Sequence, residues 1–299
     1  MLAIVHRDSY EGIEANLYDA EIIFTISLRP EQFVACKKLR WIHTPTAAVH
    51  QFLFPELVNS DVTLTNSTEV HGPVVAEHVM ALIFALAKKI PQAAALQHKH
   101  EWGKEVIWSK GTHPKEISGS TLGLVGVGSI GRRVARMASG IGMRVLAVRE
   151  HLEKEKPEGV DAVYLSSQLD DVLRQSDFVV LAAPLTPQTT KLMNGKRFAV
   201  MRPDSYLINV GRGQQVDETA LAESLRAHRI AGAALDVFEQ EPLPVDSPLW
   251  DIENLLITPH TAGITDKLWQ RHYENFSGNL RRYLARQPLQ HVVDKRKGY

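Results

Sequence analysis

The sequence contains a single cysteine, Cys36, and no excess of charge of either sign. Its 299 residues include 34 Lys or Arg and 34 Asp or Glu, so the formal net charge is zero. One cysteine excludes an intrachain disulfide and fits a reducing compartment. A balanced charge argues against a nucleic-acid partner, which requires a basic face. The one basic cluster is the short DKRKGY segment at the end of the chain.

Long hydrophobic runs are scarce. The first segment, MLAIVHRDSYEG, becomes polar after five residues, too soon for a signal peptide. The longest run, at 74–87, includes Glu77 and His78; it is too short for a membrane span and predicts a buried helix that Pro73 opens. His98 and His100 could face a metal, but no cluster of carboxylates or thiolates supports a metal site there, and the alternative is a solvated helix end. We therefore expect a cytoplasmic protein that binds neither membrane nor metal.

The sequence is rich in short apolar segments that alternate with helical patterns. Strands are predicted at 2–5, 21–26, 40–43, 62–65, 121–126, 144–148, 177–183, 205–210, 232–238 and 254–258. Helical spacing of apolar residues begins at Ile130 and near Glu218, and residues 266–287 form an amphipathic helical pattern. Such alternation predicts an α/β fold with parallel sheets covered by helices on both faces.

Glycines are concentrated in LVGVGSIG, residues 124–131, where Gly126, Gly128 and Gly131 have G-x-G-x-x-G spacing. The motif leaves a predicted strand and opens a predicted helix, the context of a dinucleotide site. The first glycine permits a tight turn, the second lets a pyrophosphate approach, and the third lets helix and strand pack closely. The pyrophosphate would lie on the helix N-terminus, at Ser129 and Ile130. The alternative is an ordinary glycine-rich turn.

The end of the next predicted strand bears on the choice of cofactor. NAD-binding proteins usually have an acidic residue there, which binds the ribose diol. Here Arg149 occupies the position, and a guanidinium can pair with a 2′-phosphate. We therefore expect NADP to be preferred over NAD. Two alternatives stay open: Glu150, directly after it, could bind the diol, and Arg149 could be an ordinary surface residue.

Hydride transfer to a carbonyl also requires a cation that holds the substrate, a proton donor, and a carboxylate that keeps the donor charged. Candidates follow predicted strands in three segments: Arg212 in INVGRG, then Asp236, Glu239 and Glu241 in LDVFEQEP, and His260 in LLITPHTAG. Each alone could be an ordinary surface or hydrogen-bonded polar residue. Their joint occurrence after a nucleotide motif favours an enzyme.

Six segments together make the sequence similar to a known family. They are VAEHVMALIFALA, GLVGVGSIGRRVAR, APLTPQTTKLMNG, LINVGRG, GAALDVFEQEPLP and ITPHTAG. The chain resembles the D-isomer-specific 2-hydroxyacid dehydrogenases, which include glyoxylate/hydroxypyruvate reductases, over nearly its whole length. The resemblance implies that Arg212 orients the substrate, that His260 donates the proton, and that Glu241 supports His260.

The resemblance also implies further binding residues. Asp236 would lie near the nicotinamide end of the cofactor, and Pro184 and Val210 are further cofactor candidates. The segment TPTAAVH, 44–50, resembles a loop usually written S-A-G-V-D, whose backbone amides hold the substrate carboxylate, so the substrate candidates are Ala47, Ala48 and Val49. Ala48 replaces the glycine of that pattern and His50 replaces the aspartate, which alters the shape of the expected pocket.

The architecture that the resemblance implies has two Rossmann-like or flavodoxin-like domains, with doubly wound parallel sheets and a deep cleft between them. The substrate domain would comprise residues 1–72 and 268–299, and the NAD(P)-binding domain 73–267. A homodimer is expected, formed through the helix that follows Pro73.

The expected reaction is reduction of a small 2-oxo acid to a D-2-hydroxy acid, with NADP or NAD as cofactor. One alternative is a non-catalytic, nucleotide-sensing regulator on the same fold, and another is a relative acting on a phosphorylated hydroxy acid or on formate. The side chain of the oxo acid stays open. Large residues that could shape its pocket are Trp41, His50, Phe52 and Phe54.

Overall fold

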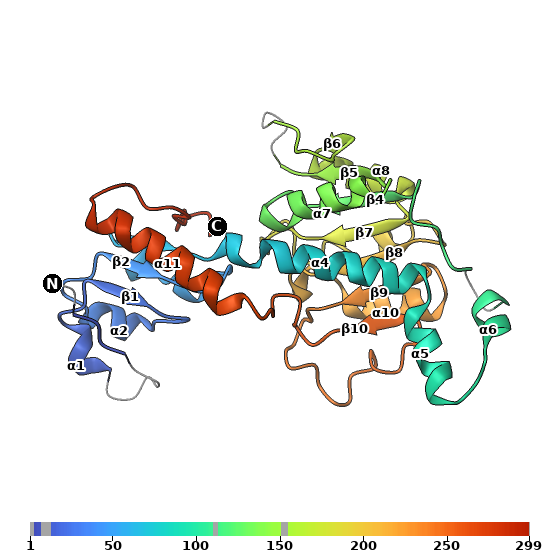
Figure 1. Ribbon diagram of the computed structural model, residues 1–299, viewed down its shortest axis with the longest axis horizontal. Coiled ribbons are helices and arrows are strands. Elements are labelled where there is room, and N and C mark those ends of the chain that lie inside the picture. Colours follow the sequence, from blue (N-terminus) through green and yellow to red (C-terminus); the bar gives the residue numbers. More distant parts are fainter. Residues whose placement is uncertain (1–2, 7–12, 110–112, 151–154, 299) are drawn as a thin grey trace. The chain divides into compact units, whose positions relative to one another are not determined.

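The computed structural model describes residues 3–6, 13–109, 113–150 and 155–298, apart from the side chains of Glu14 and Ser109 (Figure 1). The chain folds into two compact units, one of Met1–His71 with Thr265–Tyr299 and the other of Gly72–Ile264. The predicted boundaries at 72/73 and 267/268 lie one and three residues from these. The predicted cleft between the two units stays a prediction.

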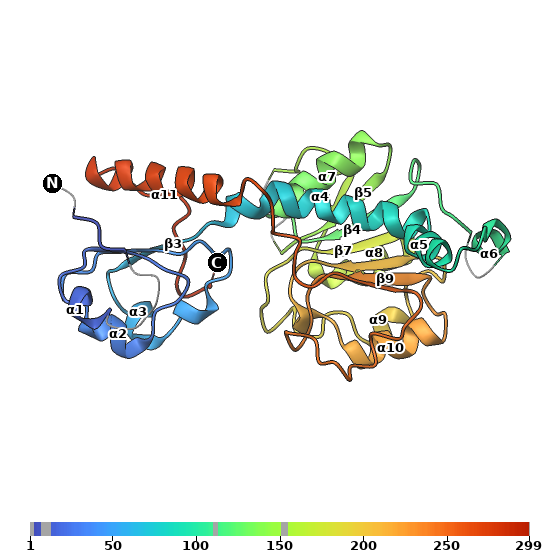
Figure 2. The same ribbon diagram turned by 60° about the horizontal axis from the view of Figure 1, so that its bottom comes forward.

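The first unit is built on a parallel sheet of three strands in the order β1-β2-β3. Its strands are β1 (Ile22–Phe24), β2 (Trp41–His43) and β3 (Thr63–Thr65). Its helices are α1 (Glu14–Leu17), α2 (Pro30–Ala35), the 3-10 helix η1 (His50–Phe52), α3 (Pro55–Val58) and α11 (Leu268–Leu284). Figure 2 shows α11 on one face of this sheet and α1, α2 and α3 on the other. Helices thus cover both faces, as the alternation predicted.

The predicted strand at 2–5 is wrong for the residues that the structure describes. Residues 3–5 lie outside the sheet, with Ile4 86% and Val5 56% exposed. A short apolar run becomes a strand only where a neighbouring strand pairs with it, and periodicity within the run cannot reveal that partner.

The second unit contains a parallel sheet of seven strands in the order β10-β9-β8-β7-β4-β5-β6. The strands are β4 (Thr121–Val125), β5 (Arg144–Val148), β6 (Ala162–Tyr164), β7 (Phe178–Leu181), β8 (Tyr206–Asn209), β9 (Gly232–Leu235) and β10 (Leu255–Ile257). In chain order this is the doubly wound arrangement, whose direction reverses between β4 and β7. Strand β6 was not predicted, because it is short, lies at the sheet edge and is only half-buried.

Alternate residues of these strands enter two separate cores. On β7, Phe178 and Val180 pack with α4 (Thr68–Ala87) and α7 (Ser129–Gly140), whereas Val179 and Leu181 pack with the opposite helices. Those opposite helices are α8 (Leu169–Gln175), α9 (Gly195–Phe198) and α10 (Glu218–Arg226). The remaining elements are α5 (Ile90–His98), α6 (Lys104–Ser109), and the 3-10 helices η2 (Ser166–Gln168) and η3 (Gly213–Gln215). A sheet buried on both faces explains the continuous apolar runs of its strands.

Helix α4 begins earlier than predicted. It starts at Thr68, so Pro73 lies inside it rather than at its first turn. Proline lacks the N–H of a normal helical hydrogen bond, and it stands one residue past the first residue of the second unit. By length and composition α4 could cross a membrane. Its core face is fully buried in the second unit, however, at Ala76, Val79 and Ile83, as in a core helix of a globular protein.

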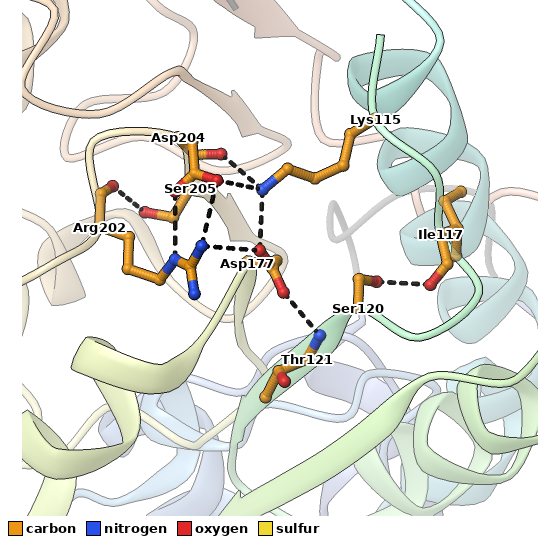
Figure 3. A network of polar contacts seen from close by, with 8 residues as sticks. All are labelled: Lys115, Ile117, Ser120, Thr121, Asp177, Arg202, Asp204 and Ser205. Carbon is orange, nitrogen blue, oxygen red and sulfur yellow. Dashed lines mark hydrogen bonds and ion pairs between the residues drawn. The ribbon is translucent and has the colours of Figure 1, made fainter. Parts of the chain in front are cut away.

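A polar network fastens the amino-terminal edge of the large sheet (Figure 3). Lys115 Nζ lies 2.8 Å from Asp177 Oδ1 and 2.9 Å from Asp204 Oδ2, and Asp177 Oδ2 accepts the backbone N–H of Thr121 at 2.8 Å. Hydrogen bonds from Arg202 and then from Lys115 lower the pKa of Asp204 to about 2. The network joins the segment before β4 to the starts of β7 and β8. It therefore stabilises the edge opposite to the one that carries the candidate site.

Candidate active site

The glycine motif forms the turn between β4 and α7. Gly126 has φ 95° and lies against the backbone of Ala183, so a side chain there is excluded by both conformation and space. A side-chain carbon at Gly131 would collide with the carbonyl oxygen of Gly126. At Gly128 the same carbon would meet nothing within 4 Å, and this N-cap residue gives α7 no side-chain cap. The turn therefore leaves an open approach to a helix N-terminus, which fits a pyrophosphate.

A cavity of about 640 Å³ lies beside this turn. Its lining residues are Val127, Gly128, Arg132, Arg149, Glu150, Glu155, Lys156, Pro157 and Glu158. Arg149 follows the last residue of β5, as predicted, and its Nη1 donates to the carbonyl of Glu155 at 3.0 Å. The Glu150 carboxylate accepts a hydrogen bond of 2.5 Å from the Ser166 hydroxyl. Arg149 and Glu150 thus both line the place where a ribose or its phosphate would be expected.

Sequence reasoning missed two further cations of this cavity, Arg132 and Lys156. Arg132 directly follows the last glycine of the motif, so a basic residue at that offset was a usable signal. Lys156 lies in a segment without periodicity, and only the fold brings it to the cavity.

The other predicted cofactor residues also follow strands of this sheet. Pro184 comes after β7, and its carbonyl accepts hydrogen bonds from Thr189 Oγ1 at 2.8 Å and from Gln215 Nε2 at 3.2 Å. Val210 comes directly after β8 and is 7% exposed. Because β4, β7 and β8 are neighbouring parallel strands, these residues share one sheet edge with the glycine motif.

The structure brings Glu241 and His260 into direct contact. His260 Nδ1 lies 2.6 Å from Glu241 Oε2, although 19 positions separate the residues in the chain. The second oxygen, Oε1, accepts the backbone N–H of Phe238 at 2.9 Å, which fixes the direction of the carboxylate. The imidazole stays half-exposed, so its Nε2 side can meet a ligand. This geometry suits a proton donor oriented by an acid.

Asp236 anchors the backbone that carries His260. Its carboxylate, in a residue 1% exposed, accepts hydrogen bonds from Thr258 Oγ1 at 2.6 Å and from the N–H groups of Thr261 and Ala262 at 2.9 and 3.1 Å. Its carbonyl accepts the N–H of His260, whose φ of 53° is unusual for a side-chain-bearing residue. A role of Asp236 toward the cofactor stays a prediction.

Sequence reasoning missed His78, which lies next to this anchor. The residue belongs to α4, and its Nε2 lies 3.2 Å from Thr258 Oγ1 and 3.7 Å from Asp236 Oδ1. No local pattern could have found it, because 180 positions separate His78 from Thr258.

Arg212 follows β8 on the loop beside the Glu241 segment. A side-chain carbon at Gly213 would collide with the carbonyl group of Phe238, so the two loops touch through their backbones. Burial lowers the pKa of Arg212, and the charge of Glu241 opposes that shift. An arginine stays charged under such conditions. Arg212, Glu241 and His260 therefore form one cluster at the carboxyl ends of β8, β9 and β10.

The predicted substrate loop lies in the first unit. The carbonyl of Ala47 accepts Asn66 Nδ2 at 2.9 Å, and that of Ala48 accepts Thr46 Oγ1 at 2.6 Å. Within the described part of the chain, the N–H groups of Ala47, Ala48 and Val49 make no hydrogen bond. Successive unpaired amides form a suitable cradle for a carboxylate.

Two of the residues expected to shape the substrate pocket are instead core residues. Trp41 and Phe52 are both fully buried. Trp41 stacks on Phe276 and Tyr283 of α11, with ring centroids 5.3 and 5.6 Å apart. Large aromatic side chains gain more from complete burial, and sequence position alone does not separate a core from a pocket.

Comparisons with known proteins identify the family of the chain. Residues 80–262 match the model of the D-isomer specific 2-hydroxyacid dehydrogenase NAD binding domain. The chain is 35% identical to the glyoxylate reductase of Korarchaeum cryptofilum over 267 residues. The aligned region covers 86% of this chain and 77% of the reductase.

Two solved structures are similar over most of their length. One is a D-isomer specific 2-hydroxyacid dehydrogenase from Xanthobacter autotrophicus in complex with NADPH and MES, with a TM-score of 0.81 and 32% identity. The superposed region covers 93% of this chain and 85% of that dehydrogenase. The other is the NADPH-dependent glyoxylate/hydroxypyruvate reductase of Sinorhizobium meliloti in complex with NADP and sulfate, with a TM-score of 0.80 and 30% identity. The superposed region covers 93% of this chain and 86% of that reductase. With a matching family domain, a relative above 30% identity and the expected doubly wound sheet, the chain belongs to the D-isomer specific 2-hydroxyacid dehydrogenases, a family of NAD(P)-dependent oxidoreductases.

Proposed function

We propose that the protein reduces a small 2-oxo acid of the glyoxylate or hydroxypyruvate type to the D-2-hydroxy acid. The observation that carries this proposal is the 2.6 Å contact between His260 and Glu241, beside Arg212 and on the same sheet as the dinucleotide turn. The names of the glyoxylate reductase relatives support the choice of substrate.

Each residue of the cluster has a distinct task in this reaction. Arg212 holds the carboxylate and keto oxygen of the substrate through its guanidinium. A nicotinamide cofactor held at the turn of Gly126, Gly128 and Gly131 would supply the hydride for the keto carbon when bound. His260 gives its Nε2 proton to the developing alkoxide, and Glu241 orients the imidazole through its contact with Nδ1.

A non-catalytic regulator on the same fold is the alternative. Such a protein requires the dinucleotide turn, but it does not require a histidine paired with an acid at the carboxyl edge of the sheet. The His260–Glu241 contact therefore favours the enzyme.

We also propose a homodimer, which is supported by large apolar side chains exposed on α5 and α6, among them Ile90, Val106 and Trp108.

An activity assay tests this function. Initial rates with glyoxylate, hydroxypyruvate, phenylpyruvate and a branched 2-oxo acid, each with NADPH and with NADH, should give the highest kcat/KM for one of the two small acids with NADPH. Absence of turnover with every pair would leave the regulator as the better proposal.

We propose that NADP is the preferred cofactor, because Arg149 has two further cations, Arg132 and Lys156, beside it in the cavity. The carboxylates of Glu155 and Glu158 line the same cavity and balance part of this charge. The free energy of phosphate binding therefore depends on Arg149, whose planar guanidinium forms directed pairs with phosphate oxygens.

Replacing Arg149 by alanine should raise KM for NADPH by about tenfold, since one charge-assisted pair contributes roughly 1.5 kcal/mol. KM for NADH, which lacks the 2′-phosphate, should stay within about twofold. The matched control is Arg144→Ala, which removes an exposed arginine from the other end of β5. Equal losses with the two cofactors would contradict the assignment.

A further inference from the structure

The orientation of Glu241 depends on a segment without regular secondary structure. Residues 236–242 follow β9 and belong to no helix or strand. Glu241 reaches His260 with one oxygen because its other oxygen is bound to the N–H of Phe238. Any movement of the peptide groups around Phe238 therefore changes the distance between the carboxylate and the imidazole.

Two side chains from elements that follow β8, Gln214 of η3 and Glu218 of α10, hold this segment at Glu239. The N–H of Glu239 donates to Glu218 Oε1 at 2.6 Å, and the carbonyl of Glu239 accepts Gln214 Nε2 at 3.1 Å. Both polar groups of one backbone residue are thus fixed from outside the segment. Glu218 is the first residue of α10, directly after the N-cap Asp217, so its own backbone is rigidly placed.

One of these side chains, Gln214, also connects the segment to Arg212. Gln214 stands two positions after Arg212 in η3, and Gly213 between them packs directly on the carbonyl of Phe238. Hence the position of Glu241 and the position of Arg212 are set by one shared contact between loops.

The environment of Glu218 is unfavourable for its charge. Its burial, followed by the negative charges of Glu239 and Glu241, raises the pKa of the Glu218 carboxyl, and the hydrogen bond from Glu239 N–H only partly opposes this. A half-buried acid near two others costs stability unless its hydrogen bond compensates. The cost is consistent with a role in the geometry of the site.

We propose that Glu218, assisted by Gln214, is a positioning residue that holds the 238–241 backbone so that Glu241 meets His260 and stays in register with Arg212. The kinetic part of this inference rests on the proposed reductase function. The geometric part does not, because it concerns contacts within the protein alone.

Two variants separate the hydrogen bond from the charge. Glu218→Ala removes the acceptor, and kcat should fall by about ten- to a hundredfold, as expected when a catalytic group is displaced. KM for NADPH should stay unchanged. Glu218→Gln keeps an acceptor oxygen without the charge and should restore kcat to within about threefold of the original protein. The matched control is Glu223→Ala, an exposed acid of the same helix.

The separate effects on kcat and on KM distinguish positioning from a loss of stability. A displaced Glu241–His260 pair lowers kcat and leaves KM for NADPH unchanged, whereas unfolding of the unit would also weaken cofactor binding. A loss of NADPH affinity equal to the loss of kcat in Glu218→Ala, or a Gln variant as impaired as the Ala variant, would overturn the proposal.

A proton NMR spectrum at low temperature tests the geometry without turnover. The hydrogen-bonded Nδ1 proton of His260, assigned by its loss in His260→Gln, should give a downfield resonance that disappears in Glu218→Ala and persists in Glu218→Gln and Glu223→Ala. If the protein proved inactive on every oxo acid, this pattern would still support the positioning role. A resonance unchanged in Glu218→Ala would refute that role even in an active enzyme.

Discussion

Replacing His260 by alanine is expected to lower kcat by a factor of about 10² to 10⁴, the usual contribution of a positioned proton donor. Alanine removes the one imidazole that Glu241 orients, and solvent must then protonate the alkoxide. Cofactor affinity should be unchanged, because the dinucleotide turn lies at other strands of the sheet. Steady-state kinetics with the best oxo acid, together with NADPH titration by fluorescence, measure the two quantities.

The control for this experiment is His228→Ala, which removes an exposed histidine of the same unit. Glu241→Gln should give a smaller loss than His260→Ala, since the imidazole remains but loses its charged partner. Full activity of the His260 variant would show that another group gives the proton and would refute the assignment.

The second large effect is a loss of stability of the first unit in acid. Its cause is a buried hydrogen-bond network around Ser67, whose hydroxyl lies within 3.3 Å of His43 Nε2, His272 Nδ1 and the carbonyl of Thr44. The hydroxyl has one proton, which the carbonyl requires. Both histidines therefore donate to Ser67, and His43 Nδ1 must accept the proton of Thr65 Oγ1 at 2.7 Å. His43 is thus held neutral.

The sign of the pH effect follows from this neutral state. Burial, then the nearby His272 and His291, lower the pKa of His43 from 6.5 to about 4, and burial and His71 lower that of His272 to about 4. Between about pH 4 and pH 6.5, these two histidines bind protons in the unfolded chain but not in the folded unit. Stability is therefore complete above about pH 6.5 and is lost as the pH falls toward 4. For His43 alone the loss is about 3 kcal/mol.

Hydrogen exchange read by mass spectrometry measures this loss within one unit. Protection of peptides from β2, β3 and α11 should decrease between pH 6.5 and 4, after correction for the intrinsic exchange rate, whereas peptides from β4 and β7 should change less. His43→Gln should flatten the dependence, and His50→Gln, an exposed histidine of the same unit, should not. Equal pH dependence in both variants would show that His43 does not cause it.

Much of the fold could be predicted from the sequence because its signals are local. A strand buried on both faces must be apolar throughout, so β4, β5, β7 and β8 were predicted within about two residues of their ends. The glycine motif carries its own context, a strand before it and a helix after it, and the structure places it in that turn. The family could also be predicted from the sequence, because each of the six segments that resemble it is a short continuous stretch of residues. The end strand β6 and the start of α4 were misjudged where exposure or an internal proline weakened the pattern.

Only the tertiary structure decided which polar residues meet. Glu241 reaches His260 because β9 and β10 are neighbours, and their carboxyl ends share an edge with the end of β8. His78, Glu218, Lys115 and His43 gained their partners in the same way, across distances in sequence that no periodicity spans. Hydrophobic burial fixes the elements through patterns of a few residues, whereas a hydrogen bond or a lowered pKa depends on ångström-scale distances between elements. The sequence by itself therefore determined the fold class and the candidate chemistry, and the packing of strands decided the site.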